Sequence, residues 1–227
     1  MINLLIVVVL SYLVGSIPTS IIASRLARGL DIRKFGSGNA GGTNVVRVLG
    51  WKIGVAVILF DILKGAIATI IIARLFWNPT LPFHNQTPFT DFTVVQIICG
   101  AAAVLGHVWT LFAGFKGGKG VATGAGMLIA VAPVEFAVSI LIFMLVFAIS
   151  RYVSLGSIIA AMAFPLTMFF RENVFNVNIH GYHTLIFFAI AISVLLLFTH
   201  RSNIKRLLAG TEHKLTSFHG SSSRPRT

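Results

Sequence analysis

The sequence predicts an all-α integral membrane protein with seven transmembrane helices, its N-terminus outside and its C-terminus cytoplasmic. Hydrophobic residues make up 56% of the 227-residue chain and charged residues only 11%, whereas a soluble domain is nearer a quarter charged. The mean hydropathy of +0.90 indicates the same class. The single cysteine, Cys99, excludes a disulfide within the chain.

Apolar segments of the length that crosses a bilayer, roughly 20 residues, divide the chain. The first has no basic residue before its apolar stretch, so we interpret it as a retained span and not as a signal peptide. The piece at 119–131 is short and ends before Pro133, which leaves a tilted, re-entrant or protein-buried helix open. The seven segments are 4–25, 53–76, 93–112, 119–131, 134–150, 153–171 and 182–199.

The distribution of positive charge predicts the orientation of these segments. The formal net charge is +12, which in a soluble protein would suggest nucleic acid. In a membrane protein it indicates basic cytoplasmic loops first and an anionic substrate second. Of the 18 Lys and Arg residues, 15 lie in four stretches, at 25–52, 114–120, 151 and 201–226. Seven spans with the N-terminus outside place all four in the cytoplasm.

No long repeat or second domain is visible, so residues 1–214 are predicted to form a single polytopic domain. Residues 215–227 are polar and predicted to be a disordered tail. The stretch at 77–92 is rich in Pro, Thr and Asn and is predicted to be an irregular outer loop.

The glycine-rich stretch "GFKGGKGVATGAG", at 114–126, is the first candidate site. It is not a Walker A loop, because three residues instead of four separate Gly114 from Gly118 and because Gly120 stands where Ser or Thr is required. Glycines still let backbone N–H groups face an anion, and a helix that begins near Lys119 adds its positive end. The alternative is a flexible inner loop with ordinary basic residues. The predicted phosphate-binding residues are Gly117, Gly118, Lys119 and Gly120.

A second candidate, "DIRKFGSGNAGGTNVVR" at 31–47, offers hydroxyls, side-chain amides, backbone donors and an arginine, which suit phosphate oxygens. The alternative is that Thr43 or Asn44 caps the next helix. The candidate binding residues are Ser37, Gly38, Asn39, Thr43, Asn44 and Arg47.

Polar residues also gather at the ends of the later spans. Ser154 and Ser157 begin one span, where a serine cap is the alternative role. His200 and Asn203 follow the last span three residues apart, hence on one helical face; an ordinary interfacial histidine is the alternative. Glu212 comes shortly after them.

Asp61 and Lys64 lie three residues apart at membrane depth, where charges usually pair, and we assign them a structural role. The chain has no histidine four residues before an aspartate, no G-x-S-x-G elbow and no HExxH motif. No metal and no cofactor are therefore expected.

Together these stretches resemble the bacterial membrane acyl-phosphate:glycerol-3-phosphate acyltransferases. Gly42 departs from the sequence pattern of that family, which usually has alanine at this position. The signatures occur in the family's order from Asp31 to Lys214: "DIRKFGSGNAGGTNVVRVLG", "DILKG", "GHVWTLFAGFKGGKGVATGAG", "SLGSI" and "HRSNIKRLLAGTEHK".

The resemblance implies transfer of a fatty acyl chain from acyl phosphate to the sn-1 hydroxyl of glycerol 3-phosphate, an early step of phospholipid synthesis. It implies a multi-pass protein of the bacterial plasma (inner) membrane, in contact with membrane lipid, whose active site faces the cytoplasm. We expect no nucleic acid and no obligate protein partner.

The same resemblance suggests a role for each candidate. The loop from Ser37 to Asn44, with Arg47, would hold acyl phosphate, and Lys119 would hold phosphate charge. Glycerol 3-phosphate would be held by Ser154, Ser157, His200 and Asn203. Either His200 or the acyl phosphate itself would take the hydroxyl proton. Glu212 would have a structural role, as Asp61 and Lys64 would. The catalytic candidates are Lys119, Ser157, His200 and Asn203.

Two other classes of function compete with this prediction. A transporter or channel for phosphorylated small molecules predicts inverted repeats, which the sequence does not show. A lipid-binding scaffold leaves Arg47, His200 and Asn203 unexplained.

Overall fold

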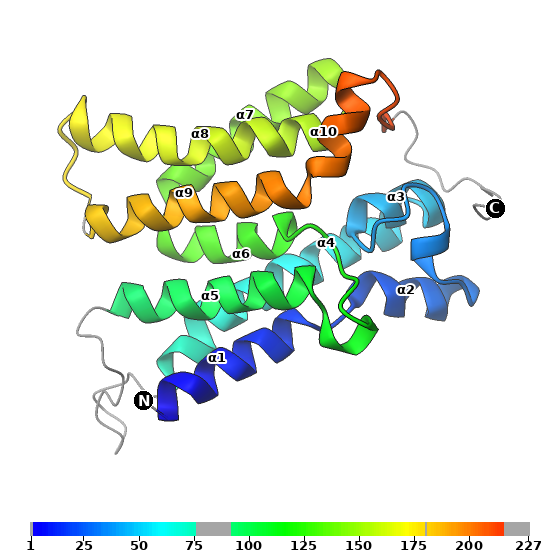
Figure 1. Cartoon of the computed structure of the whole chain (residues 1–227), viewed down its shortest axis with the longest axis horizontal. Helices are drawn as coiled ribbons and strands as arrows, with labels where there is room; N and C mark the ends of the chain where they lie inside the picture. Colours follow the sequence, from blue (N-terminus) through cyan, green and yellow to red (C-terminus); the bar gives the residue numbers. More distant parts are fainter. Residues whose placement is uncertain (1, 76–91, 180, 216–227) are drawn as a thin grey trace. The chain divides into compact units, whose positions relative to one another are not determined.

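The computed structural model describes residues 2–75, 92–179 and 181–215, and every regular element within them is helical (Figure 1). Nearly all of the 77–92 stretch and of the predicted tail lies outside the described residues. The elements are α1 Ile2–Gly15, α2 Thr19–Arg28, η1 Ile32–Lys34, α3 Gly42–Leu49, α4 Trp51–Ala66, η2 Ile67–Ile71, η3 Ile72–Arg74, α5 Phe92–Val108, η4 Leu111–Ala113, α6 Val121–Val131, α7 Pro133–Ser150, α8 Val153–Asn173, α9 Tyr182–Thr199 and α10 Arg201–Leu208.

The protein is a multi-pass integral membrane protein. Six helical segments within the described residues are long and apolar enough to cross a bilayer: Ile2–Arg28, Trp51–Arg74, Phe92–Ala113, Pro133–Ser150, Val153–Asn173 and Tyr182–Thr199. The remaining predicted span, at 119–131, corresponds to α6. This helix has 11 residues and is shorter than a crossing helix requires. The count of seven spans and the orientation of the termini stay predictions.

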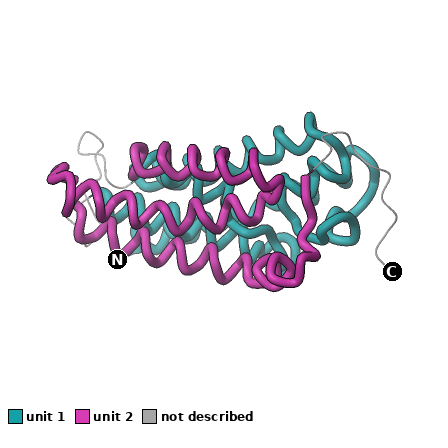
Figure 2. Tube along the Cα trace, turned by 90° about the horizontal axis from the view of Figure 1, so that it is seen from above, with its two compact units in different colours: residues 1–131, 217–227 teal, residues 132–216 magenta. Residues whose placement is uncertain are grey.

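The described chain forms two compact units, coloured separately in Figure 2. The first contains the described residues up to Val131, and the second those from Ala132 onward. In the first unit, α1 lies beside α5, and α4 packs against both α3 and α6 (Figure 1). In the second, α8 packs against α7 and α9.

Glycines permit the closest helix contacts in the first unit. A Cβ on Gly15 of α1 would collide with the backbone of Ala103 in α5, and one on Gly65 of α4 with the backbone of Thr123 in α6. Without a hydrophobic driving force between helices in lipid, such small residues let backbones approach and gain dispersion contacts.

Two features of the first unit differ from the predicted continuous spans. The segment 4–25 is broken between α1 and α2, because Pro18 has no N–H to continue the helix. The helix of α4 continues into a single π-helical turn, η2, which a sequence pattern of apolar residues does not reveal.

The alternative roles as helix caps are wrong for three residues. Helix α3 begins at Gly42 after Gly41, so Thr43 and Asn44 lie inside its first turn. Tyr152 precedes α8, so Ser154 is also inside the helix. Their side chains are therefore available for other contacts.

Candidate functional site

Asn44 organises the loop that precedes α3. Its side chain is 1% exposed, and its amide nitrogen lies 3.0–3.2 Å from three carbonyl oxygens, those of Ile32, Phe35 and Asn39. Its Oδ1 accepts a hydrogen bond from the backbone N–H of Ser37 at 2.8 Å. The loop's own backbone thus occupies the Asn44 amide, and the predicted contact of Asn44 with a phosphate stays a prediction. Asn44 fixes the loop that presents Ser37, Gly38 and Asn39.

Arg33 connects this loop to the segment that leads into the glycine loop. Its guanidinium pairs with Asp31 at 2.7 Å and also donates to the carbonyl of Ala113 at 3.0 Å. The hydrogen bonds from Arg33 hold the pKa of Asp31 below its ordinary value. Asp31 and Arg33 therefore hold this loop to the segment that precedes the glycine loop.

The glycine loop packs tightly against the end of α5. The N–H of Gly118 donates to the carbonyl of His107 at 3.0 Å, and that of Gly117 donates to Val108 at 3.1 Å. In this structure both N–H groups therefore donate to carbonyls of α5, and the role of Gly117 and Gly118 in binding phosphate stays a prediction. A Cβ on Gly117 would meet the His107 carbonyl, and one on Gly118 would meet the His107 ring. These glycines permit a close approach to α5.

The two lysines of the glycine loop differ in exposure. Lys116 is exposed, whereas Lys119 is half-buried and lies two residues before the start of α6. Gly120, which lies between Lys119 and the start of α6, has a left-handed φ of 83°, which favours glycine. This placement sets Lys119 near the positive end of α6.

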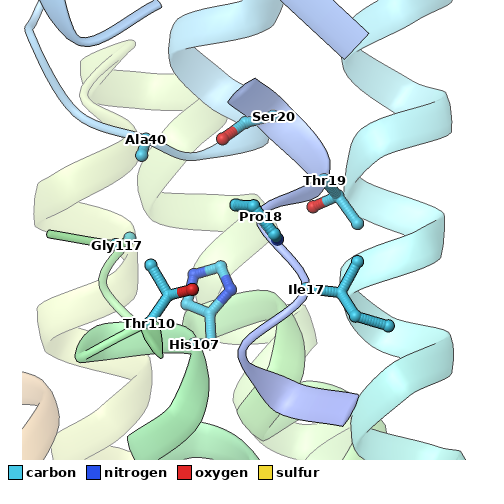
Figure 3. A pocket seen from close by; sticks show the side chains of 9 residues that line it. Ile17, Pro18, Thr19, Ser20, Ala40, His107, Thr110 and Gly117 are labelled. Carbon is cyan, nitrogen blue, oxygen red and sulfur yellow. The ribbon is translucent and has the colours of Figure 1, made fainter. Parts of the chain in front are cut away.

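A small pocket joins the two predicted phosphate loops within the first unit (Figure 3). Ala40 from the loop before α3 and Gly117 from the glycine loop both line it, beside His107 and Thr110. The break between α1 and α2 supplies the rest of the wall: Ile17, Pro18, Thr19 and Ser20. The structure thus brings segments about 80 residues apart in sequence to one place.

Three ionisable side chains form a buried cluster that includes His107 of the pocket wall. Asp61 and Lys64 form the expected pair at 2.8 Å, and the Lys64 ammonium also lies 2.8 Å from Nδ1 of His107. The exposed fractions of Asp61, Lys64 and His107 are 1%, 4% and 7%. Sequence reasoning found the pair, because its members are one helical turn apart, but it assigned no role to His107.

In the second unit, Glu212 gathers polar residues from α8 and α10. Its Oε1 accepts hydrogen bonds from Ser154 at 3.0 Å and Asn203 at 2.7 Å, and its Oε2 pairs with Arg206 at 2.8 Å. Burial opposes the carboxylate charge, but these hydrogen bonds outweigh it and hold the pKa of Glu212 below its ordinary value. Glu212 therefore fixes the orientation of Asn203 and Ser154.

His200 lies at the junction of α9 and α10 and is 3% exposed. Its Nδ1 lies 2.8 Å from the Leu196 carbonyl, which can only accept. We therefore assign the proton of the neutral ring to Nδ1, which leaves the lone pair on Nε2. Ser157 donates to the carbonyl of Val153 at 3.0 Å, so its oxygen keeps its capacity to accept.

The candidates thus fall into two groups, each described within its own unit. The first unit holds the loop residues Ser37, Gly38, Asn39, Thr43 and Arg47 with Lys119, and the second holds Ser154, Ser157, His200 and Asn203. Within the described ranges, no group of three His, Cys, Asp or Glu side chains could hold a metal ion.

Comparison with known proteins shows extensive similarity. Residues 5–210 match the family described as "Glycerol-3-phosphate acyltransferase". A protein of that name from Chlorobaculum tepidum is 51% identical over 233 residues, which cover 95% of this chain and 98% of the relative. Another from Chlorobium phaeobacteroides is 48% identical over 242 residues, covering 98% of this chain and 100% of the relative.

Two solved structures are also similar. Both are crystal structures of PlsY (YgiH), described as an integral membrane glycerol 3-phosphate acyltransferase. The glycerol 3-phosphate form aligns with a TM-score of 0.76 and 39% identity over 93% of this chain and 95% of that chain. The lysophosphatidic acid form gives 0.75 and 39% over 93% and 94%. The similarity extends over both compact units.

Proposed function

Because the chain belongs to the glycerol-3-phosphate acyltransferase family, we propose that it transfers a fatty acyl group from acyl phosphate to the sn-1 hydroxyl of glycerol 3-phosphate. The products are lysophosphatidic acid and inorganic phosphate. The solved relatives named for their glycerol 3-phosphate and lysophosphatidic acid forms support the acceptor and the product.

The observation that carries the choice of donor is the meeting of two loops, each of a type that suits phosphate, around one pocket of the first unit. Each loop is followed closely by a half-buried cation or contains one: Arg47 lies in α3, after the first loop, and Lys119 lies in the glycine loop. A phosphate dianion is stabilised by such charge-assisted contacts, and both proposed substrates carry one. We assign the loop at 37–44 and Arg47 to acyl phosphate, and Lys119 to phosphate charge.

The transfer itself needs no covalent enzyme intermediate, because acyl phosphate is already activated. The sn-1 oxygen of glycerol 3-phosphate attacks the acyl carbonyl carbon, a new C–O ester bond forms, and the bond from that carbon to the phosphate oxygen breaks. Phosphate leaves with the bonding electrons. Holding both substrates in a reactive geometry can remove roughly 7–11 kcal/mol of the barrier.

His200 is one of two candidate acceptors for the hydroxyl proton. Its Nδ1 is committed to the Leu196 carbonyl, so the lone pair of the neutral ring is on Nε2, as a general base requires. The departing phosphate is the other acceptor. Asn203 and Ser154, fixed by Glu212, and Ser157 would bind glycerol 3-phosphate.

The site would face the cytoplasm of the bacterial inner membrane, with α6 as a seventh, incomplete crossing. A helix of 11 residues is about 16 Å long, roughly half of the hydrocarbon core. The glycine loop before α6 would then enter the bilayer, at a depth where a substrate with a fatty tail can bring its phosphate group.

Phosphate release by the purified protein tests the proposal against its two competitors. An acyltransferase releases phosphate only when acyl phosphate and glycerol 3-phosphate are both present, and forms one lysophosphatidic acid for each phosphate. A transporter moves glycerol 3-phosphate across vesicles without acyl phosphate, and a scaffold does neither. Either of the last two results would refute the proposed function.

A further inference from the structure

The buried cluster of Asp61, Lys64 and His107 has no part in the proposed reaction. Asp61 and Lys64 lie on α4 within the Trp51–Arg74 span, and His107 lies near the end of α5 within the Phe92–Ala113 span. Ionisable groups inside a membrane are costly and are a functional hypothesis by default. An apolar cluster of similar volume is often at least as stable as a buried ion pair, so packing alone does not explain these residues.

The hydrogen bonds of Lys64 determine the state of His107. The ammonium has three N–H groups, and three acceptors surround it: Oδ1 of Asp61 at 2.8 Å, Nδ1 of His107 at 2.8 Å and the carbonyl of Ile17 at 3.1 Å. Nδ1 of His107 also lies 3.5 Å from Oδ1 of Asp61, but its shorter contact is with the Lys64 ammonium, which can only donate, so Nδ1 accepts. We therefore assign a neutral imidazole whose proton is on Nε2, the tautomer opposite to that of His200.

The same cluster joins two irregular segments of the first unit, the break between α1 and α2 and the glycine loop. Lys64 bonds the Ile17 carbonyl at the break between α1 and α2, and Thr19, which begins α2, donates to Asp61 at 2.6 Å. His107 is the residue whose carbonyl accepts from Gly118 and whose ring lies against that glycine. Irregular backbone at membrane depth is tolerated only where protein groups satisfy it, and this cluster supplies those groups.

We propose that Asp61, Lys64 and His107 are positioning residues for acyl transfer, which hold the glycine loop against α5 and so set the position of Lys119. Asp61 and Lys64 do not line the pocket, and His107 lines it beside Gly117 and Gly118. Lys119 directly follows Gly118, so a shift of the His107 ring displaces Lys119 through a single peptide unit. The proposal rests on the proposed role of Lys119 in binding phosphate.

Removing both charges separates positioning from simple charge pairing. Asp61→Asn or Lys64→Met alone leaves one buried charge without its partner, so each single variant should lose stability. The double variant Asp61→Asn/Lys64→Met contains neither charge and should melt at a higher temperature than either single variant. It also removes the donor to His107 and Ile17, so KM for glycerol 3-phosphate should rise about tenfold or more, with a smaller change in kcat.

The ion pair between Glu135 and Arg171 in the second unit provides a matched control. It also joins a buried carboxylate to a cation on a membrane helix, but it contacts none of the candidate residues. Glu135→Gln/Arg171→Met should keep the wild-type KM. If Asp61→Asn/Lys64→Met also folds with the wild-type KM, the cluster serves stability alone and the proposal is wrong.

Variants of His107 test whether the cluster positions the glycine loop if the double variant does not fold. Asparagine can present its amide oxygen near the position of Nδ1 and keep the bond from Lys64, whereas leucine fills the space without an acceptor. His107→Asn should therefore keep a KM closer to wild type than His107→Leu. Equal KM values for the two variants would contradict the proposal.

The tautomer can be measured without any turnover. In protein labelled with ¹⁵N-histidine, the signals lost in His107→Asn should report a neutral ring with its proton on Nε2. A proton on Nδ1 would overturn this inference and leave the proposed function intact. Failure of the wild-type protein to consume acyl phosphate, with the expected tautomer present, would instead overturn the proposed function.

Discussion

Replacing Gly118 with alanine should impair the reaction through the His107 ring. Gly118 has no left-handed φ, so the substitution adds no backbone strain. Its Cβ would instead collide with the ring of His107 and approach the carbonyl of Ala40 at 3.0 Å. Neither can move freely, because Lys64 holds the ring and the carbonyl belongs to the backbone. Overpacking of this kind costs typically 1–3 kcal/mol.

That energy predicts the size of the kinetic effect. If the loop moves to relieve the collision, the contact between Lys119 and phosphate is weakened. Each 1.4 kcal/mol of interaction energy lost from the transition state lowers kcat/KM about tenfold. Gly118→Ala should therefore lose roughly one to two decades in kcat/KM for glycerol 3-phosphate. The assay is phosphate release by purified protein in lipid nanodiscs, with melting temperature measured on the same samples.

Gly114→Ala is the matched control in the same loop. Gly114 has a φ of 65°, and a Cβ there would meet nothing within 4 Å. Alanine in this conformation costs roughly 1–2 kcal/mol of stability but contacts neither His107 nor Ala40, so kcat/KM should stay near wild type. Full activity of Gly118→Ala, or equal losses in both variants, would refute the argument.

Three further outcomes are expected. Lys119→Ala removes a charge-assisted contact worth about 1.5–3 kcal/mol and should lower kcat/KM by one to two decades, whereas Lys116→Ala, whose side chain is exposed, should not; the reverse order would identify the wrong lysine. Glu212→Gln should be less stable than wild type at neutral pH by about 2 kcal/mol; because the folded pKa of Glu212 is below its ordinary 4.5, the difference in melting temperature should shrink as pH falls below 4.5, and a constant difference would contradict this. With Cys99 replaced, Ser37→Cys should resist an impermeant maleimide in intact cells, whereas Thr87→Cys, outside the described residues, should react; labelling of Ser37→Cys would invert the topology.

The sequence predicts the helical membrane fold well because apolar run length is a local signal. All six long helical segments of the described chain coincide with predicted spans. The break at Pro18 was missed because the apolar run continues on both sides of it. The π-helical turn at Ile67–Ile71 depends on packing and has no pattern of its own.

In the candidate site, contacts between residues close in sequence could be predicted, and contacts between distant residues could not. Asp61 and Lys64 could be paired from sequence because one helical turn separates them. Their third partner, His107, lies 43 residues from Lys64, and Glu212 lies 58 residues from Ser154. Such contacts are created by tertiary packing. The contacts of the Gly117 and Gly118 N–H groups could not be predicted for the same reason, because the carbonyls that accept from them belong to α5.

The choice of acyl donor tests the central claim most directly. Purified protein in nanodiscs receives glycerol 3-phosphate with either a fatty acyl phosphate or the acyl-CoA of the same chain, and lysophosphatidic acid is quantified. The account predicts product from acyl phosphate, with one phosphate released per acyl group transferred, and none from acyl-CoA. Comparable rates with acyl-CoA, or phosphate release without lysophosphatidic acid, would contradict it.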